Sequence, residues 1–122
     1  MIFSESKLSV GDNCGAKNVK VIQVFRSSKS SGSKPMDLAV VSIRKVRRSK
    51  RIVKGEIHKG VLIRLKKKYQ RDTGLSIKFS SNTILLVDLK KVPIGSRLFG
   101  PIFKEFRLGE YPKVLSLAKT LL

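Results

Sequence analysis

Acidic residues, cysteine and histidine are all scarce in this sequence. Its 122 residues include 27 Lys and Arg against 8 Asp and Glu, with a single cysteine, Cys14, and a single histidine, His58. One cysteine cannot form an internal disulfide, so a reducing, intracellular setting is the default expectation. No stretch approaches the roughly 20 apolar residues of a membrane-spanning helix. We therefore expect no membrane partner.

The same scarcity argues against catalysis and metal binding. No spaced pair of carboxylates appears, and "GDNCGAK" lacks the Gly-Lys-Ser/Thr ending of a phosphate-binding loop. Four zinc ligands are also lacking. A dyad of Cys14 and His58 stays open from sequence alone, although an isolated cysteine is more often a small buried apolar residue. We predict a protein that is not an enzyme and has no catalytic residue, metal ion or cofactor.

Positive charge is what the sequence has in abundance. The formal net charge is +19, and basic residues run from Lys7 to Lys119 with apolar residues between them, so the charge belongs to a folded surface. Nucleic acid is the expected partner of such a surface. Residues 44–71 alone hold 13 of the 27 basic residues against one acid, Glu56. Such a one-signed segment repels itself unless an anionic partner or salt relieves it.

Contacts to the phosphate backbone and to RNA shape are expected, without readout of base edges. The basic segment does not resemble a recognition helix, a zinc finger or a strand with stacking aromatics. The predicted RNA-binding residues are Lys17, Arg44, Lys45, Arg47, Arg48, Lys50, Arg51, Lys54, Arg64, Lys66, Lys67, Lys68, Arg71 and Arg97.

Short runs rich in valine and isoleucine predict a mainly β fold. Strands are expected at residues 19–25, 38–46, 61–67, 75–79 and 83–89. Five short strands with few helical signals indicate a small, closed or nearly closed β-barrel, which leaves no exposed strand edges. The third strand is expected to alternate, with Val61, Ile63 and Leu65 facing the core and Arg64, Lys66 and Lys68 facing outward.

The pattern changes after residue 89, where short helices are expected. Pro101 suits the first turn of a helix in which Phe103 and Phe106 share a face, with Lys104, Glu105 and Arg107 outside. A second helix is expected over residues 112–119. We predict one domain over residues 1–122, with a barrel at about 1–92 and a helical extension at about 93–122. The extension is expected to be fastened to the barrel by Phe99, Phe103 and Phe106.

Several residues are expected to serve as turns. Asp and Asn bond their own backbone, and glycine permits positive φ. Gly95 and Gly100 permit turns before the first helix, which Pro101 begins. The turn residues predicted in "DNCGAK" and "DTG" are Asp12, Asn13, Gly15 and Gly74.

Four segments, in order and at matching spacing, resemble one known family. They are "DNCGAK", "GVLIRLKKKYQRDTGLSIKFSSNTILLV", "PIGSRLFGPIFKEFR" and "KVLSLA". From Leu8 to Leu122 the chain resembles the bacterial and organelle type of ribosomal protein fourteen of the large subunit. It departs from the family pattern at Cys14, Thr73, Ser96, Phe106 and the segment "LGEYP".

The resemblance implies both a fold and a function. The fold is a five-stranded β-barrel with a C-terminal helical extension. The function is that of a structural constituent of the ribosome, which binds large-subunit rRNA at the subunit interface and helps form an intersubunit bridge to small-subunit rRNA during translation. Implied partners are ribosomal proteins three and nineteen and the ribosomal silencing factor. The predicted partner-facing residues are Ser96, Arg97, Lys104, Arg107 and Lys113.

Two alternatives stay open at this point. A stand-alone single-stranded nucleic-acid-binding barrel would need exposed aromatics beside its basic groove, and Tyr69 is the one aromatic near the basic segment. The second open question is the cellular compartment in which the protein acts. The N-terminus "MIFSESKLSV" does not look like a targeting peptide, and the wealth of Phe, Ile, Lys and Ser is typical of an AT-rich genome. We expect an organelle-encoded protein, of a mitochondrion in preference to a plastid or a bacterial cytoplasm.

Overall fold

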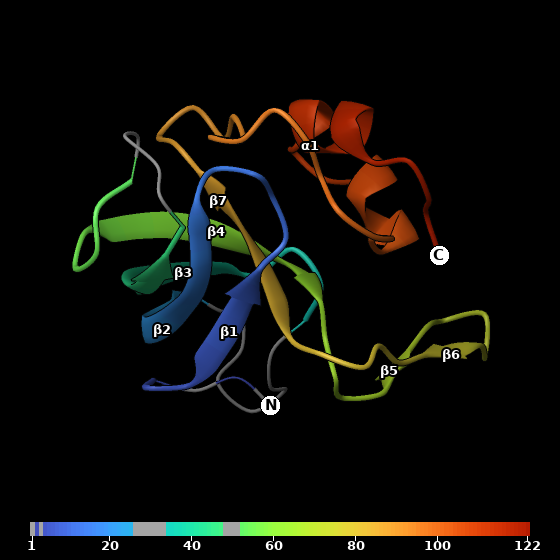
Figure 1. Cartoon of the computed structure of the whole chain (residues 1–122). Helices are drawn as coiled ribbons and strands as arrows, with labels where there is room; N and C mark the ends of the chain where they lie inside the picture. Colours follow the sequence, from blue (N-terminus) through green and yellow to red (C-terminus); the bar gives the residue numbers. More distant parts are fainter. Residues whose placement is uncertain (1, 3, 26–33, 48–51) are drawn as a thin grey trace.

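A closed five-stranded β-barrel forms the body of the protein (Figure 1). The computed structural model describes residues 2, 4–25, 34–47 and 52–122. Around the barrel the strand order is β1-β2-β3-β4-β7. Neighbouring strands are antiparallel except for β1 and β7, which close the barrel as a parallel pair. The barrel strands are β1 (Lys7–Val10), β2 (Ala16–Phe25), β3 (Leu38–Val46), β4 (Ile57–Arg64) and β7 (Thr83–Val87).

The predicted number of barrel strands is right, but one predicted member is wrong. Residues 75–79 do not enter the barrel: β6 (Ser76–Ile77) pairs only with β5 (Tyr69–Gln70), and the two form a separate hairpin. The turn between them includes Gly74 at φ +87°. The fifth barrel strand is β1, which the sequence analysis missed. With four residues it is too short to give a clear pattern, and its pairing with both β2 and β7 defines it.

The expected alternation along β4 is also wrong in part. Val61, Leu62 and Ile63 are all buried, and a register shift lies between Leu62 and Arg64. All five residues of β7 are buried as well. A strand buried without interruption has both faces covered. The chain that follows β7 returns along its edge, where the Ile94 N–H donates to the Leu86 carbonyl at 3.1 Å.

The C-terminal extension, which we define as residues 93–122, carries two short helical elements. They are a 3-10 turn, η1 (Lys104–Arg107), and a helix, α1 (Pro112–Leu117), with Pro112 in its first turn as predicted. The prediction that Pro101 begins a helix is wrong, because Phe103 is still extended at ψ 143°. Neither element, within the described part of the chain, is long and apolar enough to cross a membrane.

The three phenylalanines of this extension divide into two groups. Phe103 and Phe106 are fully buried in the hydrophobic core, which is what an anchoring role requires. Phe103 meets Phe79 and Tyr69 edge-on, with ring centroids 5.0 Å and 5.8 Å apart. Phe99 is half exposed, so it does not fasten the extension as expected.

Candidate nucleic-acid interface

The connection between β4 and β5 presents three consecutive lysines. Lys66, Lys67 and Lys68 are all exposed, which leaves them accessible to phosphates. The backbone here is held in place, because the Lys66 N–H donates to the Asn82 side-chain oxygen at 2.8 Å. A fixed backbone places the roots of these long side chains and leaves their ammonium groups in water.

Arg64, just before these lysines, is not a freely solvated side chain. Its Nε is buried and, among the described residues, has no hydrogen-bond partner. Burial lowers the pKa of the guanidinium. Nη1 lies against Gly100, at φ +82°, so closely that a Cβ there would overlap it. A desolvated arginine without a carboxylate is suited to bind an anion from outside the chain.

A second group of cations lies on β2, β3 and the turns beside them. Lys17, Arg44, Lys45, Arg47 and Lys54 are exposed, so their side chains are accessible to a partner. The remaining predicted cations of this segment, Arg48, Lys50 and Arg51, lie outside the described residues.

Two further lysines belong to this group and were missed by the sequence analysis. Lys7 and Lys20 face one another across β1 and β2. They line an open pocket of about 390 Å³ together with Arg44 and Lys45. The signal for Lys20 was in the sequence, since it stands between two valines, Val19 and Val21, that are buried. Lys7 could not be found in this way because β1 itself was not predicted.

The "DNCGAK" turn and the "IGSR" segment, which are far apart in the sequence, hold one another in place. The Asn13 side-chain oxygen accepts the N–H groups of Ser96 and Arg97 at 2.9 Å and 3.0 Å, and its amide donates to the Ser96 hydroxyl at 3.0 Å. Gly95 fits because a Cβ would lie 2.8 Å from the Asn13 oxygen. These bonds fix the backbone that carries Arg97, whose side chain is exposed.

Asp12 is buried at the same contact. One carboxylate oxygen accepts the Cys14 N–H at 3.3 Å, and the other has no hydrogen-bond partner among the described residues. Burial raises the pKa of this carboxyl, while hydrogen bonding with Cys14 opposes the shift. Asp12 and Asn13 therefore do more than form the predicted local turn, because they join the barrel to the C-terminal extension.

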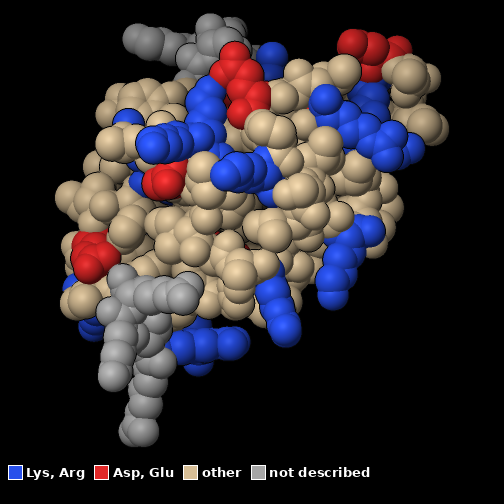
Figure 2. Space-filling view, turned by 90° about the horizontal axis from the view of Figure 1, so that it is seen from above, with Lys and Arg blue, Asp and Glu red and all other residues tan. Residues whose placement is uncertain are grey.

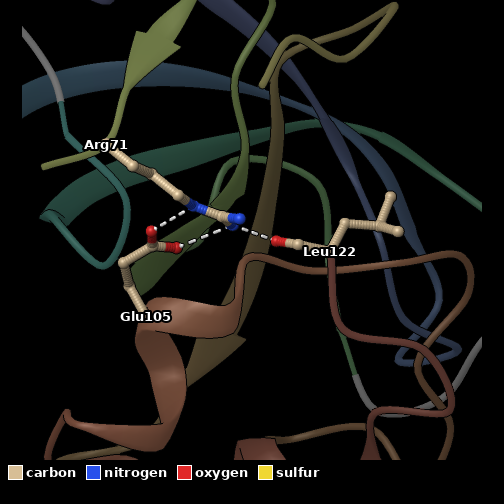
Figure 3. Close-up of polar contacts among 3 residues, drawn as sticks. All are labelled: Arg71, Glu105 and Leu122. Carbon is tan, nitrogen blue, oxygen red and sulfur yellow. Dashed lines mark hydrogen bonds and ion pairs between the residues drawn. The ribbon is translucent and has the colours of Figure 1, made fainter. Parts of the chain in front are cut away.

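Arg71 stands apart from the other predicted RNA-binding residues because its guanidinium is turned inward (Figure 3). Nε and Nη2 donate to the two carboxylate oxygens of Glu105 at 2.7 Å and 3.3 Å, and Nη2 also donates to the Leu122 carbonyl. The expectation that Glu105 stays outside is wrong for the same reason. We assign Arg71 to holding the β5–β6 hairpin against the C-terminal extension.

Basic side chains are spread widely over the surface (Figure 2). Seen from above, the molecule shows many Lys and Arg side chains, with a few acidic ones among them. The extension contributes Arg97, Lys104, Arg107 and Lys113, all exposed. Among the described residues none of these four has an ion-pair partner, in contrast to Lys91, which pairs with Glu110.

Comparison with known proteins decides what this basic surface serves. The family model described as Ribosomal protein L14p/L23e matches residues 1–122, the whole chain. The chain belongs to this family. It is therefore a structural constituent of the large ribosomal subunit that binds rRNA. The fold implied by the resemblance of its motifs is confirmed by the closed barrel.

In this L14p/L23e protein the surroundings of Cys14 and His58 do not favour a catalytic dyad. Burial, followed by a hydrogen bond with Asp12, raises the pKa of the Cys14 thiol to about 12, so at neutral pH it is protonated and a poor nucleophile. His58 contacts Glu56 at 2.7 Å. The family is one of structural components.

Base stacking also finds little support near the predicted cluster. Tyr69 packs edge-on against Phe103 and is only partly exposed. The half-exposed Phe99 lines a pocket of about 220 Å³ with Lys17 and Arg47. Single-strand binding normally uses several stacked aromatics, so this L14p/L23e protein is better suited to the phosphate backbone.

Proposed function

We propose that this protein binds large-subunit rRNA through the cations of its barrel and presents its C-terminal extension at the subunit interface, where it helps form a bridge to small-subunit rRNA during translation. One observation carries the proposal: in the described part of the chain, exposed cations without ion-pair partners occupy both the barrel and the extension, which are fixed to one another. Two such surfaces suit two different anionic partners.

A bridge requires that the extension is held in a fixed position relative to the barrel. A bridge must hold two RNA surfaces at a set distance, so a loosely tethered extension would not serve. Here Asn13 fixes the backbone of Ser96 and Arg97, and Arg71 ties the hairpin to Glu105. The exposed Lys113 is carried on α1, whose Val114 is buried.

Further partners follow from the same surface. Ser96, Arg97, Lys104, Arg107 and Lys113 are proposed to face the partner across the interface, and Ser96, Arg97 and Lys113 to receive the ribosomal silencing factor. Ribosomal proteins three and nineteen are the proposed neighbours within the subunit. The proposed compartment is a mitochondrion, and mass spectrometry of ribosomes purified from isolated organelles tests it.

Charge reversal on the two bodies tests the bridge. Large subunits carrying Arg97→Glu with Lys113→Glu should contain the protein at normal levels after a moderate salt wash, but should join small subunits roughly tenfold more weakly, since two phosphate contacts become repulsive. Sucrose gradients at limiting Mg²⁺ measure joining. The barrel pair Lys67→Glu with Lys68→Glu should instead lower the amount of protein retained in the subunit.

Retention of the protein in the large subunit tests rRNA binding, and joining of the two subunits tests the bridge. If the extension variant is retained and joins small subunits like the wild type, the bridge is wrong while rRNA binding stands. If both variants are retained and join normally, the assignment of cations to partners is wrong as a whole.

A further inference from the structure

The outer side of β1, β2 and β3 carries a compact group of cations. Lys7 and Lys20 are a cross-strand pair, and Lys20 is in turn opposite Ser42 on β3. Arg44 follows two residues after Ser42, on the same face of the strand. The buried residues at the alternate positions, such as Val19 and Val41, point into the barrel. The open pocket of about 390 Å³ is lined by Lys7, Asn18, Val19, Lys20, Arg44 and Lys45.

This arrangement works against the stability of the isolated protein. Like charges directly opposite one another destabilise a strand pair. No acidic residue appears among the described lining residues, and Glu5 lines only an adjoining pocket with Lys20 and Arg44. Within the described chain none of the four cations has an ion pair. An anion from outside the chain would relieve this repulsion.

The chemistry of the pocket selects the kind of anion. The cations extend across three neighbouring strands, roughly 10 Å at the usual strand spacing, which suits a run of phosphates better than one small ion. No aromatic side chain lines the pocket, so a base would find nothing to stack on. Asn18 adds an amide that can bond a phosphate oxygen or a ribose hydroxyl.

We propose that Lys7, Lys20, Arg44 and Lys45 form a second RNA-backbone site on the outer side of β1, β2 and β3, separate from Lys66, Lys67 and Lys68. In Figure 1 β2 and β3 are labelled on the left of the barrel, and the β5–β6 hairpin, which follows the three lysines, projects on the right. β1 lies nearer to these lysines, because Asn82 accepts the Ser9 N–H through its carbonyl at 3.3 Å and the Lys66 N–H through its side chain at 2.8 Å. The site deepens the rRNA binding of the family and does not depend on the bridge. With this site the barrel contacts RNA at two places.

Salt-dependent binding of the purified chain to a short RNA duplex tests the site. The logarithm of the binding constant falls linearly with the logarithm of salt concentration, by about 0.9 per phosphate contact. Neutralising four contacts should make this slope shallower by about 3 to 4. The site variant combines Lys7→Gln, Lys20→Gln, Arg44→Gln and Lys45→Gln. The control variant, with the same loss of charge at other exposed lysines, combines Lys59→Gln, Lys78→Gln, Lys90→Gln and Lys119→Gln.

The comparison of the two variants gives a clear decision. A slope change of this size in the site variant, with a change of at most about 1 in the control, supports the proposal. Equal changes would mean that only net charge matters and would overturn it. Circular dichroism shows whether each variant is folded. Because the bridge is measured by subunit joining, its failure would leave this result unaffected.

Lysine acetylation in intact large subunits supplies a test that needs no variant. Lys7, Lys20 and Lys45 should be protected in the subunit and become reactive when the RNA is digested with ribonuclease. Reactivity in the intact subunit would overturn the proposal. Protection that persists after digestion would also overturn it, because an acidic segment of a neighbouring protein, and not RNA, would then cover the site.

Discussion

The barrel and the C-terminal extension are held by different kinds of contact. The barrel strands are joined by ladders of backbone hydrogen bonds, interrupted by a few register shifts, that close on themselves. The extension meets the barrel through isolated bridges, Asp12 with Leu98 and Val87 with Pro93, and through particular side chains. Asn13 belongs to the barrel side of this contact, whereas Phe103 and the Arg71–Glu105 pair join the extension to the β5–β6 hairpin and the residues next to it.

This difference separates general stability from the placement of a surface. A closed ladder distributes the stability of the barrel over many small contributions, and no strand edge is left for another chain. The extension depends on few contacts, each of which carries a large share. Single substitutions at these contacts should therefore weaken the hold on the extension, with its exposed cations, and lower the free energy of unfolding.

Removal of Phe103 should have the largest effect. Phe103→Ala deletes a fully buried ring that touches Phe79 and Tyr69 edge-on, and we expect a loss of about 3–5 kcal/mol in the free energy of unfolding. Denaturant titration followed by circular dichroism measures it. Phe99→Ala, in the same segment but half exposed, is the matched control and should cost less than about 1 kcal/mol. Equal losses would contradict the division of the phenylalanines.

The difference between local pattern and long-range pairing explains which strands could be predicted from the sequence. The strands β2, β3 and β7 have a clear valine and isoleucine pattern, and the prediction located each of them, with β3 correct at both ends. The number of barrel strands agrees only because the missed β1 offsets the wrongly assigned strand at residues 75–79. The hairpin of β5 and β6 was misplaced because its residues have the same β character as a barrel strand. Only pairing with distant residues tells the two apart, and pairing is not a local property.

The candidate site shows a related limit. Exposure of Lys66, Lys67 and Lys68 could be predicted from charge alone. The inward turn of Arg71 could not, because Glu105 is 34 residues away. The contact of Asn13 with Ser96 spans 83 residues and was equally invisible. Charge identifies a basic surface, whereas the long-range partners decide which cations remain free.

Loss of the Arg71 contact should have an intermediate effect. Arg71→Ala leaves the partly buried Glu105 carboxylate without its two charge-assisted hydrogen bonds, and we expect a loss of about 1–2 kcal/mol in the free energy of unfolding. Arg107→Ala removes an exposed cation of the same extension and should change stability by less than about 0.5 kcal/mol. A double-mutant cycle with Glu105→Ala measures the coupling; a coupling near zero would show that the pair does not hold the hairpin.

The carboxyl of Asp12 should give the smallest effect, visible only as a dependence on pH. Burial raises the pKa of Asp12 above its ordinary value of 3.8, so the folded protein binds this proton more tightly than the unfolded chain. Its contribution to the free energy of unfolding is then most favourable at low pH and declines as the pH rises through the folded-state pKa.

Asp12→Asn isolates that contribution, because an amide resembles the protonated acid and can still accept the Cys14 N–H. The variant and the wild type should be similarly stable at acid pH, and the variant should become relatively more stable as the carboxyl of the wild type ionises. Asp72→Asn, at an exposed turn, removes the same charge and should not show this divergence. If the two variants follow the same curve, the buried contact between barrel and extension does not disfavour the charge. The pH dependence would then come from the net charge of the whole protein.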